Sequence, residues 1–463
     1  MPGWRARSAC LLDRRATPDF IDEPNHGCPS SGTMNERDID LREGWPHRAW
    51  LASLIQHGVK LGLSNIRTLL RALDNPHHRL RCVHVAGTNG KGSTCAFIDA
   101  MLRAAGLRVG RYTSPHLHDV TERIQVNGQP IPESAFAEAM DRARRAASSL
   151  PHPPTFFEAL TAAAFDWFAR EEVDAAIIEV GLGGRFDATS VIENPAVSII
   201  TGIGLEHTRY LGTTHQAIAM EKAGILRPGA PALVGPCPPE AAAVIEARAE
   251  TVRAPLLLAG RDFLLEPRGD FWTPAVRARF RDREWLSPVL PLPGTHQALN
   301  AGLALVAVHH ACQALGVSAD MDTLVPALAT ARWAGRLEKV LNDPPVLLDA
   351  AHNPQGIQAI LPALEEAIVL FAVASDKDAA TMASLLSGKA AEVVITAFRG
   401  SRAMPVEQLA RYCVRPPHAV IPSIPDALPV AIDLARQQGR RLVVLGSIYA
   451  VAEARALCLA CGS

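Results

Sequence analysis

The chain has 463 residues, a formal net charge of −1, 48% hydrophobic residues and 20% charged residues. This length exceeds what one hydrophobic core usually spans, so the sequence predicts at least two domains. The near-neutral charge gives no reason to expect nucleic acid or an acidic membrane as a partner, and no apolar run is long enough to cross a bilayer. A polyanionic ligand would therefore need positive groups gathered locally.

The nine cysteines are odd in number and irregularly spaced. This pattern argues against a disulfide framework and is typical of a reducing compartment, which favours a cytoplasmic protein.

The first part of the chain, residues 1–45, mixes proline, glycine and charge without sustained periodicity, and we expect it to be disordered. Met34 lies within it and is an alternative start. From Trp50 onward, apolar residues recur at helical spacing, and a second amphipathic helix is predicted over Ile66 to Leu73.

Apolar strands then alternate with helices along the chain. Val83 to Val85 is predicted to be a strand that leads into a glycine-rich turn and a helix from about Ser93 to Ala105. Ala175 to Val180 and Val197 to Thr201 are near-continuous apolar runs, which is typical of buried parallel strands. This alternation predicts an α/β fold with helices on both faces of a sheet.

A proline-punctuated stretch, Pro288 to Pro293, suggests the boundary between a first α/β domain at 46–293 and a second α/β domain at 294–463. The strands expected in the second domain are Val346 to Leu348, Ile368 to Val373, Val393 to Thr396 and Leu442 to Leu445.

The turn after the first strand has the composition of a phosphate-binding loop. Its sequence is Gly-Thr-Asn-Gly-Lys-Gly-Ser at 87–93. The glycines let backbone N–H groups face a phosphate, the helix N-terminus adds partial positive charge, and Lys91 can reach the β- and γ-phosphates of a nucleotide. Only two residues separate Gly87 from Gly90, so the loop is a variant of the usual P-loop. A tight turn with an exposed lysine is the alternative interpretation.

From this loop onward the sequence resembles the Mur-ligase superfamily, and within it the folylpolyglutamate synthase branch. The matching motifs are Gly87 to Ser93, Thr113 to Leu117, Glu122 to Ile124, Thr155 to Glu158, Glu179 to Thr189, Gly204 to His207, Glu221 to Ile225, His296, Gln297, Asn300, Gly335 to Glu338, Asp349 to Pro354, Asp376 to Asp378 and Gly446 to Tyr449. Two positions depart from the family pattern, since Glu206 stands where the family usually has Asp and Ser190 where it usually has Asn.

The resemblance implies a P-loop ATPase-like central domain and a Rossmann-like C-terminal domain. It implies an ATP-dependent ligase that adds L-glutamate to dihydropteroate and to the γ-carboxylate of tetrahydrofolates, through an acyl phosphate. The expected ligands are ATP, Mg²⁺, dihydropteroate, folates and L-glutamate, and the expected protein is a cytoplasmic monomer without nucleic-acid or membrane partners.

The resemblance also assigns roles to individual residues. For ATP these are Thr88, Asn89, Gly90, Lys91, Gly92, Ser93, Asn300, Arg336, Asp349 and His352. The expected metal-binding residues are Ser114, Glu179 and His207, and the expected dihydropteroate-binding residues are Thr155, Phe186, Asp187 and Ala188. Lys91, Lys222 and His207 are expected to act in catalysis, and Lys222 can be carbamylated in this family.

Each of these residues also has a purely structural interpretation. Glu179 could be a buried structural carboxylate, Lys222 could cap a helix beside Gly224, and Arg336 could be a surface arginine. Two other functions stay open at this point: a Mur-type ligase acting on a cell-wall nucleotide or cyanophycin, and a non-catalytic nucleotide-binding protein.

Overall fold

The computed structural model describes residues 46–58 and 62–461. The predicted disorder of residues 1–45 and the alternative start at Met34 lie outside the described residues.

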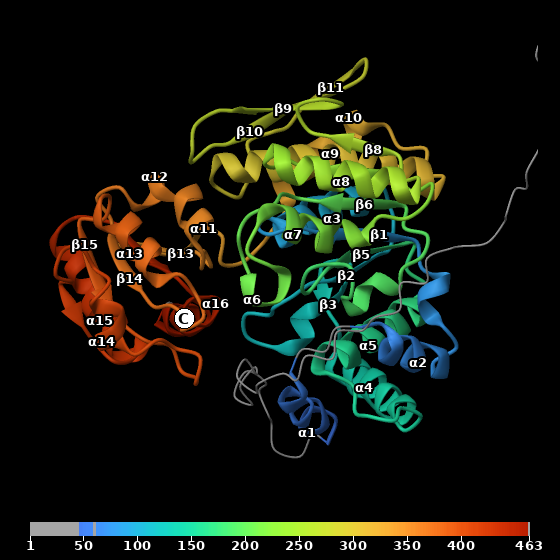
Figure 1. The fold of residues 1–463 in the computed structure, drawn as a ribbon. Helices are drawn as coiled ribbons and strands as arrows, with labels where there is room; N and C mark the ends of the chain where they lie inside the picture. Colours follow the sequence, from blue (N-terminus) through green and yellow to red (C-terminus); the bar gives the residue numbers. More distant parts are fainter. Residues whose placement is uncertain (1–45, 59–61, 462–463) are drawn as a thin grey trace, which may run out of the picture. The chain divides into compact units, whose positions relative to one another are not determined.

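The first sheet has eight strands in the order β4-β3-β2-β5-β1-β6-β7-β8 (Figure 1). The strands from β2 to β8 in this order are parallel, whereas β3 is antiparallel to β2 and β4 to β3. Their bounds are β1 Cys82–Ala86, β2 Val109–Tyr112, β3 Ile124–Val126, β4 Gln129–Pro130, β5 Ala175–Glu179, β6 Val197–Ile200, β7 Ala232–Val234 and β8 Leu256–Leu258.

Alternate residues of the central strands enter cores on opposite faces of this sheet. In β1, Val83 and Val85 belong to one core, whereas Cys82 belongs to the other. Because both faces are buried, the strands contain apolar residues at nearly every position, as the sequence predicted.

Helices cover both faces. The core that contains Val83 is closed by α3 (Lys91–Ala104) and α9 (Thr295–Leu315), and Figure 1 shows these two on the side of the sheet away from α4 and α5. The core that contains Cys82 is closed by α1 Pro46–Ser53, α2 Ser64–Ala72, α4 Glu133–Ala147 and α5 Phe156–Arg170. A third core lies under α7 (His215–Lys222) and α8 (Pro239–Val252), which follow the short helix α6 (Thr208–Leu211).

A small antiparallel sheet packs against the outer side of α9. It consists of β9 (Phe263–Arg268), β10 (Ala275–Phe280) and β11 (Arg283–Leu286) in the order β11-β10-β9, and the alternation of β10 directs Val276 and Ala278 into the core. Of the helices within the described ranges, α9 alone is long and apolar enough to span a membrane, but 67% of its apolar stretch is buried inside the protein. The sequence did not predict this sheet.

α9 begins directly after the boundary expected at residue 294 and lies in the first domain's core, which favours a later boundary. Its residues share that core with Val83 and Val85, and so does Ala331, beyond the short helix α10 (Met321–Leu324). Leu337 is the first residue that belongs to the core of the following sheet. We propose that the domain boundary lies between Ala331 and Leu337, and that the prolines at 288–293 are only a connection within the first domain.

The second sheet has six strands in the order β12-β13-β17-β14-β15-β16, with β12 antiparallel and the others parallel (Figure 1). Its strands are β12 Glu338–Asn342, β13 Pro345–Leu348, β14 Ile368–Phe371, β15 Glu392–Ile395, β16 Ala419–Val420 and β17 Leu442–Leu445. Its helices are α11 Pro354–Ala359, α12 Leu361–Leu364, α13 Ala379–Ser387, α14 Val406–Ala410, α15 Ile424–Gln437 and α16 Ile448–Cys461.

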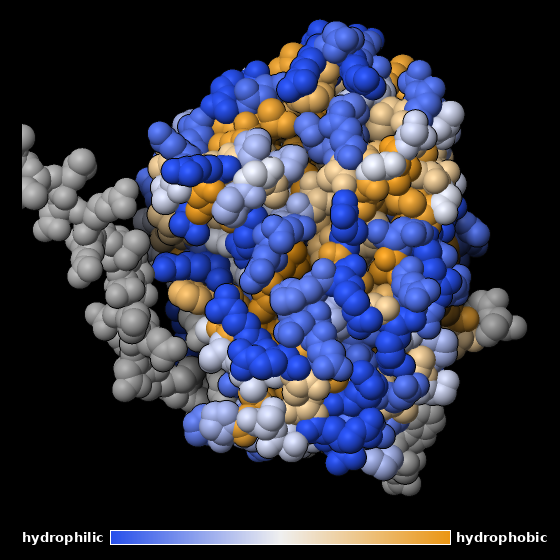
Figure 2. Space-filling view, turned by 90° about the vertical axis from the view of Figure 1, so that its right-hand side faces the viewer, coloured by the Kyte–Doolittle hydropathy of each residue, from blue (hydrophilic) through white to orange (hydrophobic). Residues whose placement is uncertain are grey.

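Both faces of the second sheet are also buried. In β17, Val443 and Leu445 enter the core under α11 and α13, whereas Leu442 and Val444 enter the core under α15 and α16. The predicted α/β class with helices on both faces is confirmed. On the surface, Figure 2 shows a face where polar and charged side chains predominate and apolar residues are exposed only in small groups.

Candidate active site

The glycine-rich segment links the end of β1 to the start of α3. The first helical bond runs from the Thr94 N–H to the Gly90 carbonyl (2.9 Å), so the preceding N–H groups of the turn have no partner within the helix. Gly90 has φ +85°, and a Cβ there would lie 2.4 Å from Oδ1 of Asn300. A Cβ on Gly87 would lie 1.9 Å from Oγ1 of Thr201. The glycines are therefore required both by backbone conformation and by close neighbours.

Hydrogen bonds hold the loop against the end of β6. Thr88 donates its backbone N–H to the Gly202 carbonyl (3.0 Å) and exchanges two bonds with the backbone of Gly204 through Oγ1 (3.1 and 3.0 Å). Thr201 donates its hydroxyl to the Asn89 carbonyl (2.6 Å). The loop is thus a preorganised element rather than a flexible connection.

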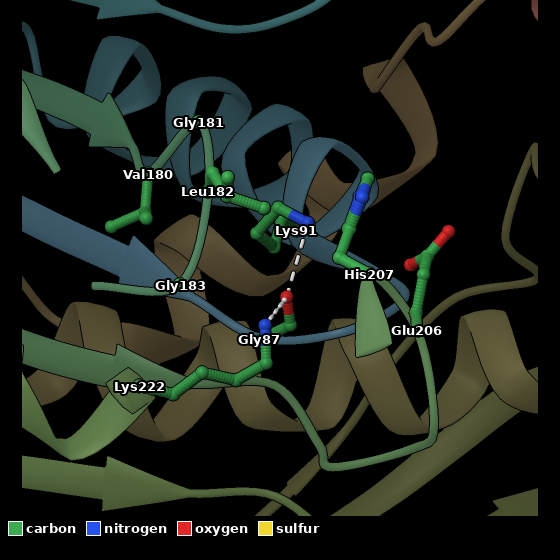
Figure 3. A pocket seen from close by; sticks show the side chains of 9 residues that line it. All are labelled: Gly87, Lys91, Val180, Gly181, Leu182, Gly183, Glu206, His207 and Lys222. Atoms are coloured by element: carbon green, nitrogen blue, oxygen red, sulfur yellow. Dashed lines mark hydrogen bonds between the residues drawn. The ribbon is translucent and has the colours of Figure 1, made fainter. Parts of the chain in front are cut away.

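Two lysines from different elements converge on this loop (Figure 3). Lys91 Nζ donates to the carbonyls of Gly87 and Thr88, at 3.1 Å each, and Lys222 Nζ donates to the Gly87 carbonyl at 2.8 Å. Both line one pocket together with Glu206, His207 and the segment 180–183. Lys222 is the last residue of α7, as the sequence predicted.

The environment of Lys222 disfavours its ammonium form. The side chain is buried, and this desolvation, with Lys91 as the nearest like charge, lowers the pKa of Lys222 to about 7. A substantial fraction of neutral amine therefore exists at physiological pH, which an exposed lysine would not offer.

Two of the three expected metal-binding residues are directly connected. Glu179 ends β5 and accepts the backbone N–H of Ser114 (3.0 Å). Burial raises the pKa of Glu179, and the charge of Lys91 opposes that rise. A buried carboxylate beside a hydroxyl-bearing residue offers the hard oxygen atoms that Mg²⁺ prefers, so this donor set fits the ion.

His207 lines the pocket next to Lys91. It precedes α6 in the left-handed conformation (φ +52°) and the residue is exposed, while partial desolvation of its ring, opposed by Glu206, lowers the pKa of His207. Among residues 46–58 and 62–461, no three His, Cys, Asp or Glu side chains gather as a metal site, and the expected set includes only two of these residue types.

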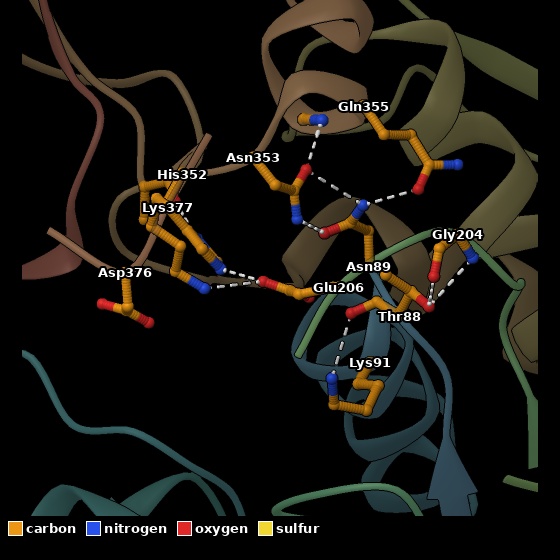
Figure 4. Close-up of polar contacts among 12 residues, drawn as sticks. Thr88, Asn89, Lys91, Gly204, Glu206, His352, Asn353, Gln355, Asp376 and Lys377 are labelled. Atoms are coloured by element: carbon orange, nitrogen blue, oxygen red, sulfur yellow. Dashed lines mark hydrogen bonds and ion pairs between the residues drawn. The ribbon is translucent and has the colours of Figure 1, made fainter. Parts of the chain in front are cut away.

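A polar network connects the loop region with the second domain (Figure 4). The buried Glu206 accepts from Nε2 of His352 (2.7 Å) and from Nζ of Lys377 (3.1 Å), and these partners keep the pKa of Glu206 well below its usual value despite burial. Asn89 donates to Oε1 of Gln355 (2.9 Å) and accepts from Nδ2 of Asn353 (3.1 Å). The second domain therefore touches the phosphate loop through side chains.

The expected nucleotide-binding residues beyond the loop fall into two groups. Asn300, on α9, lies against Gly90 as part of the first domain. Asp349 follows β13 and accepts backbone N–H groups from Leu337 (2.9 Å) and Ala351 (2.8 Å). These two backbone donors stabilise the buried carboxylate of Asp349 within the protein itself.

Arg336 is half-buried rather than exposed. Its guanidinium donates to the carbonyl of Gly335 (2.9 Å). The surface position that was the alternative interpretation of this arginine is therefore not what the structure shows.

The expected dihydropteroate-binding residues also have structural roles. Thr155 caps α5 in a reciprocal pair with Glu158, and Asp187 accepts the N–H groups of Gly181, Leu182 and Thr189. Ala188 is buried in the turn that follows, and the Arg185 guanidinium lies 4.7 Å from the centroid of the Phe186 ring. Asp187 thus shapes the loop after β5.

The sequence matches two known families of protein domains. Residues 85–232 match the Mur ligase middle domain, and residues 335–448 match the Mur ligase glutamate ligase domain. The chain is 34% identical to the dihydrofolate synthase/folylpolyglutamate synthase of Bacillus subtilis, over 88% of this chain and 97% of that protein. It is 35% identical to the folylpolyglutamate synthase of Lacticaseibacillus casei, over 84% and 92%.

The chain belongs to the folylpolyglutamate synthase family of Mur ligases. Solved structures agree with this assignment. A Mycobacterium tuberculosis folylpolyglutamate synthase complexed with ADP is similar with a TM-score of 0.81 and 32% identity, covering 89% of this chain and 99% of that one. Escherichia coli FolC in complex with DHPP and ADP is similar with a TM-score of 0.81 and 30% identity, covering 90% and 97%.

Several residues at this family site were not singled out from the sequence. Thr201, Lys377 and Gln355 contact the loop or Glu206, yet each is an ordinary polar residue in its local sequence. Phe157 packs against the core that contains Cys82, and a Cβ on Gly181 would lie 2.5 Å from the nearest atom of its ring. The glycines at 181–184 could have indicated from the sequence that a large side chain packs closely against this segment.

Proposed function

We propose that this protein is an ATP-dependent ligase that joins L-glutamate to dihydropteroate, forming dihydrofolate, and to the γ-carboxylate of tetrahydrofolates. Family membership over most of the chain supports the reaction class, and relatives named for both synthase activities support the pair of acceptors. The observation that carries the proposal is the convergence of Lys91 and Lys222 on the Gly87 carbonyl of the glycine-rich loop.

The chemistry requires activation of a carboxylate, which is a poor electrophile at neutral pH. A carboxylate oxygen of the acceptor attacks the γ-phosphorus of ATP, and ADP leaves. The amine of glutamate then attacks the acyl carbon, the carbon–oxygen bond breaks, and phosphate leaves with that oxygen. Positioning and charge neutralisation therefore account for most of the catalysis.

In this proposal the loop N–H groups hold the nucleotide phosphates, with Thr88, Asn89, Gly90, Gly92 and Ser93 forming the cradle. Lys91 exchanges its loop carbonyls for the transferred phosphate, because a phosphate is the stronger acceptor for an ammonium group. Asn300 supports Gly90 from the side, Arg336 approaches from the connection between the domains, and Asp349 and His352 approach from the second domain.

We further propose that Lys222 reacts with carbon dioxide to form a carbamate. Its amine is buried with a pKa of about 7, and the neutral amine is the nucleophile in such a reaction. Carbamylation would replace one of two adjacent positive charges by a negative one, which suits a pocket that must also accommodate a cation.

Ser114, Glu179 and His207 are the residues that would hold Mg²⁺. The ion would neutralise the phosphate charge when bound. Thr155, Phe186, Asp187 and Ala188 are proposed to form the dihydropteroate site, with Asp187 acting by shaping its loop. We also propose a cytoplasmic monomer that needs neither nucleic acid nor a membrane.

The test is an assay of the purified protein with ATP, L-glutamate and either dihydropteroate or tetrahydrofolate. We expect ADP release that depends on both glutamate and the pterin, with a glutamylated product for each acceptor. Turnover with a UDP-muramyl substrate instead would favour the cell-wall alternative. Nucleotide binding without any acceptor-dependent turnover would favour the non-catalytic alternative.

A further inference from the structure

An indole ring occupies the space beside the phosphate loop. A Cβ on Gly92, in the first turn of α3, would lie 2.5 to 2.9 Å from three atoms of the Trp333 ring. Trp333 lies in the connection between the first domain and β12, and it packs against the core that contains α3. Gly92 is thus needed because this ring lies directly on the backbone.

A buried arginine fixes the ring from another side. The Arg111 guanidinium, on β2, lies 5.2 Å from the centroid of the Trp333 ring. Arg111 is itself held by Asp99 of α3 (3.3 Å) and by Gln125 of β3 (2.5 Å), and within the described ranges its Nε has no hydrogen-bond partner. The ring face therefore adds to the stabilisation of a buried cation whose hydrogen bonding is incomplete.

The same connection is fixed again a few residues later. Gly335 donates its N–H to Glu338 (2.9 Å) and accepts from the Ala350 N–H (2.9 Å), and Leu337, at φ +47°, donates to Asp349 (2.9 Å). Residues 334–336 therefore connect two parts of the chain that are held in place: Trp333, whose indole packs on α3, and the residues that bond to the end of β13.

Arg336 lies inside this bridge. Burial raises the pKa of Glu179 and of Asp349, and the charge of Arg336 opposes the rise at both carboxyl groups. Its charge thus acts on carboxyl groups from both domains, while its guanidinium donates to the carbonyl of the preceding residue. Since the guanidinium bonds to the carbonyl of the neighbouring residue, its position depends on that of the backbone here.

We propose that Trp333 is a positioning residue: its indole, clamped between Gly92 and Arg111, anchors the interdomain connection to the phosphate-loop helix and so places Arg336 at the transferred phosphate. This inference rests on the proposed function of Arg336. The anchor links the helix that follows the phosphate loop to the residue proposed to meet the phosphate, through one side chain.

The experiment is a double-mutant cycle on kcat with Trp333→Ala, Arg336→Ala and the double variant, at saturating ATP, dihydropteroate and glutamate. Trp333→Ala should lower kcat about 10-fold or more and leave the KM for ATP within about twofold, because misplacement of a group acting in the transition state affects kcat. In the Arg336→Ala background the same change should lower kcat by less than about twofold. Trp272→Ala is the matched control, since Trp272 lies under the Arg441 guanidinium (5.0 Å) in another part of the chain, and its kcat should be unchanged.

Independent, multiplicative losses in the double variant would overturn the proposal, as would a wild-type kcat for Trp333→Ala. If Trp333→Ala does not fold, Trp333→Phe provides the test: it keeps an aromatic face for Arg111 but a smaller ring on Gly92, and its loss of kcat should likewise vanish in the Arg336→Ala background. A wild-type protein without glutamate-dependent turnover would instead contradict the proposed function.

Discussion

Two ammonium groups compete for one backbone oxygen at the centre of the site, and this pairing indicates what each lysine does. Lys222 is buried and donates to Gly87, whereas Lys91 is shared between the Gly87 and Thr88 carbonyls. Carbonyl oxygens are weaker acceptors for an ammonium group than phosphate oxygens. Lys91 can therefore exchange these carbonyls for a phosphate, whereas the buried Lys222 is the lysine proposed to form a carbamate.

Lys91→Ala should lower kcat by about 10³-fold at saturating ATP, because it removes a charged donor from the transferred phosphate. The fold should be retained, since the loop is held by Thr88 and Thr201 rather than by this lysine. The measurements are kcat and the melting temperature, with Lys389→Ala, an exposed lysine paired with Glu365, as control. Near-wild-type turnover of Lys91→Ala would refute the phosphate-loop assignment.

His84 should make the protein acid-sensitive. It is fully buried on β1, and burial, together with Arg227, lowers the pKa of His84 to about 3. Thr189 Oγ1 donates to Asp187 (2.5 Å), so it accepts from Nε2 of His84 (2.9 Å), which leaves Nδ1 without a proton and, among the described residues, without a partner. Since the folded pKa lies below the unfolded one, the folded state binds fewer protons, and stability falls as pH drops from about 6.5 towards 3.

The measurement is urea unfolding of wild type and His84→Gln between pH 7.5 and 4. At pH 4 His84 should account for about 3 kcal/mol of the stability that the wild type has lost, and the variant should lack that part of the pH dependence. His152→Gln, at an exposed site, should follow the wild-type curve. Parallel curves for His84→Gln and wild type would show that His84 does not titrate as described.

At the level of elements, a buried arginine of α1 joins this helix to α4 and to the segment before β3. Arg48 donates to both oxygens of Glu133, which begins α4, at 2.9 and 2.5 Å, and to both oxygens of Asp119 at 3.0 and 3.2 Å. Burial of the guanidinium is compensated by these two carboxylates, which also hold its pKa above the usual value.

Arg48→Met keeps much of the side-chain volume but leaves two carboxylates together without their cation. We expect a loss of about 3 kcal/mol in the free energy of unfolding, typical of breaking a buried ion pair. Arg144→Met, which removes an exposed pair with Asp141, should cost less than about 0.5 kcal/mol. Equal effects of the two substitutions in urea unfolding would contradict a structural role for the Arg48 cluster.

The sequence predicted best those strands in which apolar residues form an uninterrupted run. β1, β5 and β6 were predicted within a residue or two, since strands buried on both faces contain few polar residues. The domain boundary was expected at residue 294 because prolines at 288–293 look like a linker. By composition, α9, which is buried among α3 and β9 to β11, cannot be distinguished from a core helix of the next domain.

The sequence predicted some residues of the site and missed others, and the difference has a physical reason. Glycines and lysines in one segment indicate a phosphate loop, because that function is local in sequence. The contacts of Glu206 with His352 and Lys377 join residues 146 and 171 positions apart, and no local pattern predicts such pairs. The role of Trp333 likewise could not be predicted from the sequence, because it depends on the indole packing directly against the backbone of Gly92, which has no side chain.

At the level of the whole molecule, the proposed site draws on both domains. Lys91, Glu179 and His207 belong to the first domain, whereas Asp349 belongs to the second and Arg336 lies in the connection between them. A clamp assembled from both domains acts mainly on the transition state and also excludes water from the acyl phosphate.

Arg336→Ala should therefore slow the chemical step rather than only weaken ATP binding. We expect the single-turnover rate of acyl phosphate formation at saturating ATP to fall at least about 10-fold. Rapid-quench measurement with dihydropteroate and ATP gives this rate directly, and Arg332→Ala, next to Trp333 but bonded to carbonyls of the first domain, is the matched control. An unchanged single-turnover rate in Arg336→Ala would exclude the clamp even if the ligase activity is present.

The central claim is that the protein activates an acceptor carboxylate as an acyl phosphate. The most direct measurement uses dihydropteroate labelled with ¹⁸O in both carboxylate oxygens, together with ATP and L-glutamate, followed by mass analysis of the released phosphate. Because the acyl carbon–oxygen bond breaks when glutamate attacks, the phosphate should contain one ¹⁸O atom for each amide formed. Unlabelled phosphate released together with the glutamylated product would contradict the account.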